Sequence, residues 1–150
     1  MPDRLHTISI AADADQARLR EVWESSVRAT HTFLTEDDLV FLKPLVREEL
    51  ARLSPILCLR DRAGRPYAFM FVERSRIEML FVAPAHRGSG AGRTLVEHAI
   101  RSLGARHVDV NEQNGLALRF YEHLGFRKTG RSPLDPQGKP FPILQMTLSP

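Results

Sequence analysis

Residues 76–103 read RIEMLFVAPAHRGSGAGRTLVEHAIRSL and predict a strand, a glycine-rich turn and a helix in succession. Ile77–Val82 is apolar apart from one carboxylate, which favours a largely buried strand, since the run is too short for a helix. Ala83-Pro84 ends that strand, because proline cannot donate a hydrogen bond to a sheet. Apolar residues then recur at helical spacing over Leu95–Leu103. The glycines therefore lie at a helix N-terminus.

The turn Arg87–Gly92, which we call the glycine loop, is suited to binding an anion. A helix N-terminus presents free N–H groups and the positive end of the helix dipole, and glycines let a ligand approach the backbone. Two phosphate-binding motifs are excluded by spacing. A Walker loop would need glycine at Arg87 and lysine at Arg93, and a dinucleotide fingerprint would need G-x-G-x-x-G, whereas these glycines alternate.

The pattern [QR]-x-x-G-x-[GA] just after a strand ending in LFVxP resembles the acyl-CoA-binding signature of the GCN5-related N-acetyltransferases. A second pattern, N-x-x-A-x-x-F-Y-x-x-x-G-F over Asn114–Phe126, is similar to the later motif of the same family. Trp23–Leu34 and Asp135–Pro142 further resemble a bacterial subgroup, the YjaB-like acetyltransferases. The two main motifs occur in the family's order and at its spacing, so the resemblance extends well beyond one short pattern.

The resemblance implies a mixed α/β fold with a mostly antiparallel central sheet, helices on both faces, and a single N-acetyltransferase domain over residues 1–150. The order of predicted elements agrees with it. The Ile77 strand, a helix and a strand at residues 106–111 follow one another, so these two strands should be parallel with a right-handed crossover. Further strands are expected at residues 7–11, 56–60, 66–72, 127–132 and 143–148.

Two helices are expected between the first two strands. Asp13 is a candidate cap for the first helix. Its inner face would comprise Leu19, Val22, Trp23, Ser26 and Val27. Thr35 is a candidate cap for the second helix, and Pro44 predicts a kink there or a division into two short helices.

The resemblance also implies acetyl-CoA as the acyl donor and assigns residues to it. The backbone of the strand end would pair with the pantetheine arm, the glycine loop and the arginines at its borders would hold the pyrophosphate, and Asn114 would hydrogen-bond near the pantetheine end. The expected cofactor-binding residues are Leu80, Phe81, Val82, Arg87, Gly88, Ser89, Gly90, Ala91, Gly92, Arg93 and Asn114.

Acetyl transfer to an amine needs a base for an amine with a pKa of about 10.4 and an acid for a thiol with a pKa of about 8.5. Tyr121 matches the family position of the general acid; the alternative is a tyrosine that only packs in the core. Glu78 is the carboxylate of the central strand and a candidate base; the alternatives are an ion pair with Arg74 or Arg76, or a solvated strand face. His31 lies between the two N-terminal helices. It is a candidate base or a residue that binds the acceptor, and the alternative is a histidine that caps a helix or lies on the surface.

Composition excludes several other classes of protein. The chain has 150 residues, 43% of them hydrophobic, and a net charge of +3 without a run of five basic residues, so nucleic-acid binding is not expected. There is no signal peptide and no run of eighteen apolar residues, which predicts a cytoplasmic protein without a membrane span. The histidines have no metal-ligand spacing, and Cys58 in an apolar run predicts a buried structural thiol.

The sequence leaves the acceptor open. An amine on a small molecule or on a protein would satisfy the chemistry, and either a monomer or a homodimer would satisfy the composition. The main hypothesis is an acetyl-CoA-dependent N-acetyltransferase that works by direct attack of the amine in a ternary complex. A non-catalytic CoA-binding sensor or interaction module is the alternative, because fold and cofactor site do not establish catalysis.

Overall fold

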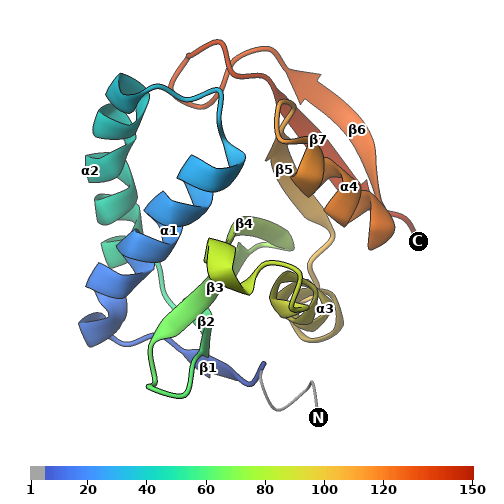
Figure 1. Ribbon diagram of the computed structural model, residues 1–150. Helices are drawn as coiled ribbons and strands as arrows, with labels where there is room; N and C mark the ends of the chain where they lie inside the picture. The colour runs from blue at the N-terminus through green and yellow to red at the C-terminus, as the bar shows by residue number, and fades with distance from the viewer. Residues whose placement is uncertain (1–5) are drawn as a thin grey trace. The chain divides into compact units, whose positions relative to one another are not determined.

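The computed structural model describes residues 6–150 (Figure 1). The strands are β1 Ile8–Ile10, β2 Leu57–Arg60, β3 Pro66–Glu73, β4 Arg76–Val82, β5 His107–Asn111, β6 Phe126–Ser132 and β7 Ile143–Leu148. The helices are α1 Gln16–Thr30, α2 Glu36–Arg52, α3 Ala91–Leu103 and α4 Gly115–His123. The hydrogen-bonded strand order is β1-β2-β3-β4-β5-β7-β6. β1–β2, β2–β3, β5–β7 and β6–β7 are antiparallel and β4–β5 is parallel, which confirms the predicted mixed, mostly antiparallel sheet.

The chain forms two compact units, and each contains part of β3, β4 and α3. The first unit comprises the chain up to Phe71 together with Met79–His98. The second unit comprises Val72–Glu78 and Ala99–Pro150. The single domain expected over residues 1–150 stays a prediction.

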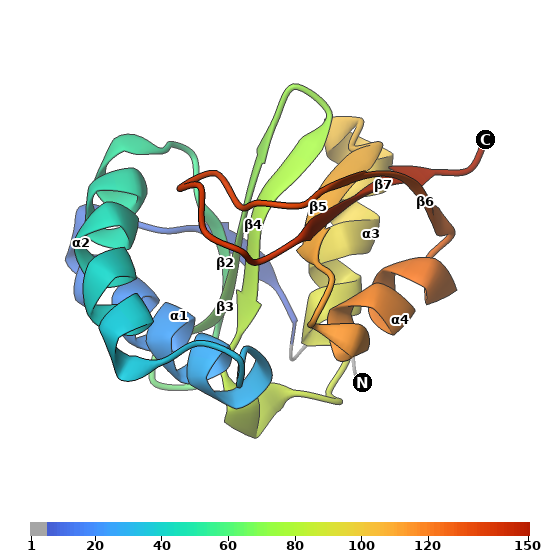
Figure 2. The same ribbon diagram turned by 90° about the horizontal axis from the view of Figure 1, so that it is seen from above.

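In the first unit, helices lie on both sides of the strands. Figure 2 shows α1 and α2 on one side of β2 and β3, and α3 on the other. The buried residues of α1 are Leu19, Val22, Trp23, Ser26 and Val27. These are the residues of the predicted inner face, because one apolar stripe at helical spacing is enough to orient an amphipathic helix on a core.

The start of α2 is capped by the predicted threonine. The backbone N–H of Asp38 donates to Thr35 Oγ1 at 3.1 Å, and the backbone N–H of Thr35 donates to Asp38 Oδ2 at 2.9 Å. This reciprocal pair is a capping box. The helix continues through Pro44 to Arg52, so of the two predicted outcomes the division into two helices is wrong, and the kink stays a prediction. The capped N-terminus and the packing of Leu39 and Leu50 hold one helix despite the missing proline donor.

The start of α1 differs from the prediction at its cap. A 3-10 turn, Asp13–Asp15, precedes the helix, and Asp15, in place of Asp13, is the N-cap residue of α1, although its side chain makes no capping hydrogen bond to that helix. Asp15 Oδ2 accepts a hydrogen bond of 2.7 Å from the backbone N–H of Ala12. The difference arises because a partner distant in the chain, Arg60, binds the same carboxylate.

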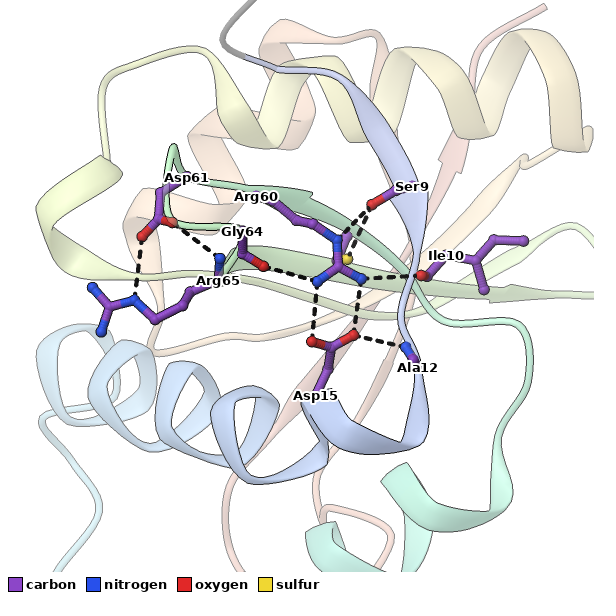
Figure 3. A network of polar contacts seen from close by, with 9 residues as sticks. Ser9, Ile10, Ala12, Asp15, Arg60, Asp61, Gly64 and Arg65 are labelled. Carbon is purple, nitrogen blue, oxygen red and sulfur yellow. Dashed lines mark hydrogen bonds and ion pairs between the residues drawn. The ribbon is translucent and has the colours of Figure 1, made fainter.

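Arg60 on β2 joins three segments of the first unit through one guanidinium group (Figure 3). It donates to both oxygens of Asp15 at 3.0 and 2.8 Å and to Ser9 Oγ at 3.0 Å. It also donates to the carbonyl oxygens of Ile10 at 3.2 Å and Gly64 at 3.0 Å. A planar guanidinium suits this arrangement because its donors are fixed in a fork. The network ties β1 and the start of α1 to the β2–β3 hairpin.

Asp15→Asn is expected to lower the free energy of unfolding at pH 7 by about 1 kcal/mol, since the charged pair is lost but both side chains keep solvent contact. The hydrogen bond from Arg60 lowers the pKa of Asp15 in the folded state. The carboxylate therefore stabilises the fold above its unfolded pKa, and this contribution is lost as the pH falls through the folded pKa. Urea unfolding across the acid range should show the two proteins converging at low pH, while the exposed neighbour variant Asp13→Asn stays near wild type throughout. If the difference in unfolding free energy between wild type and Asp15→Asn did not change with pH, this role of the Asp15 carboxylate would be contradicted.

In the second unit, β7 lies between β5 and β6, and α4 contacts β6. The parallel pairing of β4 and β5 aligns Arg76 with His107 and Ile77 with Val108, which confirms the predicted parallel pair. The chain leaves α4 at Gly125, whose φ of +99° favours glycine. Within residues 6–150, none of the helices has the length and apolar character that a membrane span requires.

The single cysteine is buried in the first unit, as predicted. Cys58 is 0% exposed, and its Sγ lies 3.6 Å from Ser9 Oγ. Burial raises the pKa of the thiol, which removes the reactive thiolate at neutral pH.

We expect a disulfide reagent such as DTNB to label Cys58 at the rate of unfolding, with full labelling in denaturant as the control. Labelling within seconds in the native state would contradict this burial.

Candidate functional site

The glycine loop lies in the first unit between the end of β4 and the start of α3. The backbone N–H of Ala83 donates to the carbonyl of Tyr67 at 2.8 Å, which fixes the end of β4 to β3. A 3-10 turn, Pro84–His86, leads into the loop. Gly88 and Gly90 have φ angles of +79° and +89°, a backbone region that glycine adopts without strain. The loop is thus an exposed glycine-rich turn that opens a helix, as predicted.

The charges around the loop fit an anionic ligand. Arg87 is exposed, and so is Arg93 in the first turn of α3, whose Nε lies 3.5 Å from Glu97 Oε1. An exposed i,i+4 pair of this kind contributes little, so a phosphate can compete for the arginine. Backbone N–H groups at a helix start and two nearby guanidinium groups are a donor set for phosphate oxygens. The loop therefore has the chemistry of a pyrophosphate site.

The strand β4 is more exposed than predicted. Over Ile77–Val82 only Ile77 is buried, at 3% exposure, while Glu78 is exposed and Met79 and the residues after it are half-buried. The expectation of a largely buried strand is wrong, because an apolar run does not reveal whether one face or both faces of a strand are covered. In the first unit, Leu80, Phe81 and Val82 form the last part of β4. The aromatic ring of Phe81 lies 5.5 Å from that of Phe69.

Glu78 lies in the second unit, on the solvent-exposed part of β4. Of its two predicted ion-pair partners, Arg76 binds Asp109 on β5 with a distance of 2.7 Å. The exposed position suits a base that exchanges protons through water, and the choice among a base, an ion pair and a solvated strand face stays a prediction. Glu78 thus stays a candidate base, but the argument that it is a buried carboxylate no longer holds.

His31 is the C-cap of α1 and is half-buried. Thr30 Oγ1 donates to the carbonyl of Ser26 at 2.8 Å and lies 2.8 Å from His31 Nδ1. Because the hydroxyl has one proton, Nδ1 must be the donor in the second bond, which leaves the lone pair on Nε2. Burial lowers the pKa of His31, so the imidazole is neutral at pH 7. This arrangement leaves Nε2 able to accept a proton or a hydrogen bond.

Tyr121 lies on α4 in the second unit and is 6% exposed. Its ring makes edge contacts with Phe120 at 5.0 Å and Phe126 at 5.5 Å between centroids. Burial raises the pKa of Tyr121, which keeps the phenol protonated at neutral pH. The ring therefore packs in the core, as the predicted alternative stated, and the hydroxyl is in the protonation state that an acid requires.

Asn114 is the N-cap of α4. Its Oδ1 accepts a hydrogen bond of 3.2 Å from the backbone N–H of Ala117, which sets the orientation of the side chain. The cap uses the amide oxygen, so the NH₂ group is the part that a cofactor carbonyl would meet. Glu78, Asn114 and Tyr121 belong to the second unit, and the glycine loop, the end of β4 and His31 belong to the first.

The sequence did not indicate one residue beside the glycine loop. His6 Nε2 lies 2.7 Å from the carbonyl oxygen of Ser89, a residue 83 positions further along the chain. No motif or periodicity relates positions so far apart. Among the residues that the structure describes, no cluster of three or more histidine, cysteine, aspartate or glutamate side chains is placed to hold a metal ion.

Comparison with known proteins agrees with these features. Residues 59–148 match the family model of the acetyltransferase (GNAT) domain. The peptidyl-lysine N-acetyltransferase YjaB of Escherichia coli (strain K12) is 40% identical over 125 residues, which are 83% of this chain and 84% of that protein. The protein of the same name from Salmonella typhimurium is 38% identical over 129 residues, which are 86% and 88% of the two chains.

Solved structures show the same relationship. The solution structure of the apo form of YjaB from Escherichia coli has a TM-score of 0.86 and 37% identity, and it covers 94% of this chain and 95% of that one. The PaiA N-acetyltransferase of Thermoplasma acidophilum, solved in complex with coenzyme A, has a TM-score of 0.69 over 96% of this chain and 99% of its own. At 18% identity, this second likeness concerns the fold alone.

Proposed function

This chain belongs to the GCN5-related N-acetyltransferase (GNAT) family and transfers an acetyl group from acetyl-CoA to an amine, and we propose that its acceptor is the side-chain amine of lysine residues in proteins. The observation that carries the proposal is the 40% identity, over 83% of the chain, to a peptidyl-lysine N-acetyltransferase. The family and these relatives support an enzyme over a non-catalytic CoA-binding module.

The donor is held by the residues predicted from the family motifs. Backbone N–H groups of the glycine loop bind the pyrophosphate, and Arg87 and Arg93 add positive charge. The backbone of Leu80–Val82 pairs with the pantetheine arm, as an added strand pairs with a sheet edge. The NH₂ group of Asn114 donates to the arm. The positive-φ glycines and the helix start at Ala91 support this assignment.

In the reaction, the neutral amine attacks the thioester carbonyl, the carbon–sulfur bond breaks and the thiol leaves with a proton. Tyr121 donates its phenolic hydrogen to the departing sulfur, a role supported by its protonated state. Glu78 takes the proton of the amine, directly or through water. Nε2 of His31 serves as a second base or orients the acceptor, a role supported by its lone pair and neutral ring.

The test is an acetylation assay with purified protein and acetyl-CoA. Thiol release is followed over lysine-containing peptides and, in parallel, over small-molecule amines, and mass spectrometry locates the acetyl group. Reactions without protein correct for spontaneous acetylation. Protein-dependent acetylation of peptide lysines supports the proposal. Turnover of small amines alone would overturn the lysine acceptor and keep the enzyme class.

The expected cytoplasmic location, the monomeric or homodimeric state and the lack of nucleic-acid binding stay predictions. The oligomeric state is read directly from light scattering of the purified chain. Retention on DNA or RNA at about 0.15 M salt would contradict the prediction that the protein does not bind nucleic acid.

A further inference from the structure

His6, Tyr67 and His86 form a cluster beside the glycine loop, all within the first unit. His6 Nε2 lies 2.7 Å from the carbonyl oxygen of Ser89, and His6 Nδ1 lies 2.8 Å from the hydroxyl of Tyr67. The ring of Tyr67 stacks on that of His86, with 4.0 Å between centroids and 14° between planes. The cluster thus contacts both the loop and the turn that leads into it.

The direction of each hydrogen bond follows from the groups involved. A carbonyl oxygen only accepts, so Nε2 of His6 carries the hydrogen that binds Ser89. In the neutral ring Nδ1 then has the lone pair, so the hydroxyl of Tyr67 donates to it. Two hydrogen bonds in series therefore connect the Tyr67 hydroxyl with His6 and His6 with the backbone of the glycine loop.

Tyr67 anchors these two hydrogen bonds to the sheet. It lies at the start of β3, is 2% exposed, and its carbonyl accepts the 2.8 Å hydrogen bond from Ala83 at the end of β4. The ring of His86 also stacks on the phenol ring. His6 is therefore held by β3 and by the turn before the glycine loop. Its hydrogen bond to Ser89 restrains the backbone of the loop.

The bond to Ser89 determines where the next N–H group points. The Ser89–Gly90 peptide is trans, so its carbonyl and the N–H of Gly90 point in opposite directions. With the carbonyl held on His6, the Gly90 N–H faces away from His6. Glycine rotates freely enough to let this peptide flip, and Gly90 already has a φ of +89°. A hydrogen bond at the carbonyl selects one of the two orientations.

We propose that His6 is a positioning residue for acetyl-CoA, which holds the Ser89 carbonyl so that the N–H of Gly90 is oriented to bind the pyrophosphate before the cofactor arrives. The proposal rests on the proposed role of the glycine loop. Loss of one neutral hydrogen bond that preorganises a site corresponds to an affinity loss of about fivefold.

The test is calorimetric titration with CoA of the wild type, His6→Ala and His6→Gln. The Ala variant should bind about fivefold more weakly, and the Gln variant should recover most of the affinity, because its amide Nε2 can donate to Ser89. Tyr67→Phe keeps the ring stacked but removes the donor to His6, and it should give an intermediate loss. The melting temperature of each variant shows whether it is folded.

The line width of the Gly90 amide resonance is a second readout, because exchange between two orientations of the peptide broadens it, whereas loss of a nearby ring alone only shifts it. In the wild type the resonance should be sharp and should shift strongly on addition of CoA, and in His6→Ala it should broaden before CoA is added, since the peptide is free to flip. Equal CoA affinity in wild type and His6→Ala, or a Gly90 resonance as sharp in His6→Ala as in the wild type, would overturn the proposal.

Arg87→Ala separates this inference from the loop assignment. If Arg87→Ala and His6→Ala both weaken CoA binding, both ideas stand. If only Arg87→Ala does, the loop binds the cofactor and the role of His6 is wrong. If neither does, the assignment of the pyrophosphate to the glycine loop fails, and the role of His6 fails with it.

Discussion

Tyr121→Phe is expected to lower kcat about 100-fold while the affinity for acetyl-CoA stays within about twofold of wild type. The substitution removes one hydroxyl and keeps the ring that packs against Phe120 and Phe126. A group that donates to the sulfur only as the bond breaks acts on the transition state alone, so its loss appears in kcat. Steady-state kinetics with a reactive amine and a CoA titration measure the two quantities.

Two controls accompany this variant. His123→Ala changes an exposed residue near the end of the same helix and should leave kcat near the wild-type value. Urea unfolding of Tyr121→Phe should show a free energy within about 1 kcal/mol of wild type, since the core packing is kept. A kcat equal to that of wild type would show that Tyr121 is a core residue only, and the acid would have to be sought elsewhere.

Gly88→Val is expected to weaken CoA binding at least tenfold, or about 1.4 kcal/mol. The φ of +79° at Gly88 is strained for a β-branched residue, so valine would pull the loop out of the shape that presents its N–H groups. Gly64 in the β2–β3 turn is a matched control, because its φ is +81° and a Cβ at either glycine meets nothing within 4 Å. The two substitutions therefore carry a similar backbone penalty.

Calorimetry with CoA distinguishes the two glycines. Gly64→Val should lose a similar amount of stability, about 1–3 kcal/mol, and keep its CoA affinity within about twofold. A separation of this kind assigns the loss at Gly88 to the binding site and not to general destabilisation. If both variants bind CoA equally well, the glycine loop is not the pyrophosphate site.

Local sequence patterns predicted most of the elements and the position of the glycine loop. The cap at Thr35, the buried stripe of α1 and the glycine-rich turn before α3 each depend on residues that recur within about four positions, so they can be read along the chain. The parallel pair β4–β5 follows from a strand, helix and strand in succession. The candidate cofactor residues followed from motifs of the same local kind.

Features that depend on distant residues appeared only in the folded chain. Arg60 binds Asp15, which lies 45 positions away, and His6 binds Ser89, which lies 83 positions away. The exposure of Glu78 depends on which neighbouring elements cover each face of β4. Neither residue propensities nor spacing rules predict such contacts, because the contacts form between distant segments that the fold brings together. The sequence thus specifies the elements and the chemistry of the loop, while tertiary packing sets exposure, protonation and the support behind the loop.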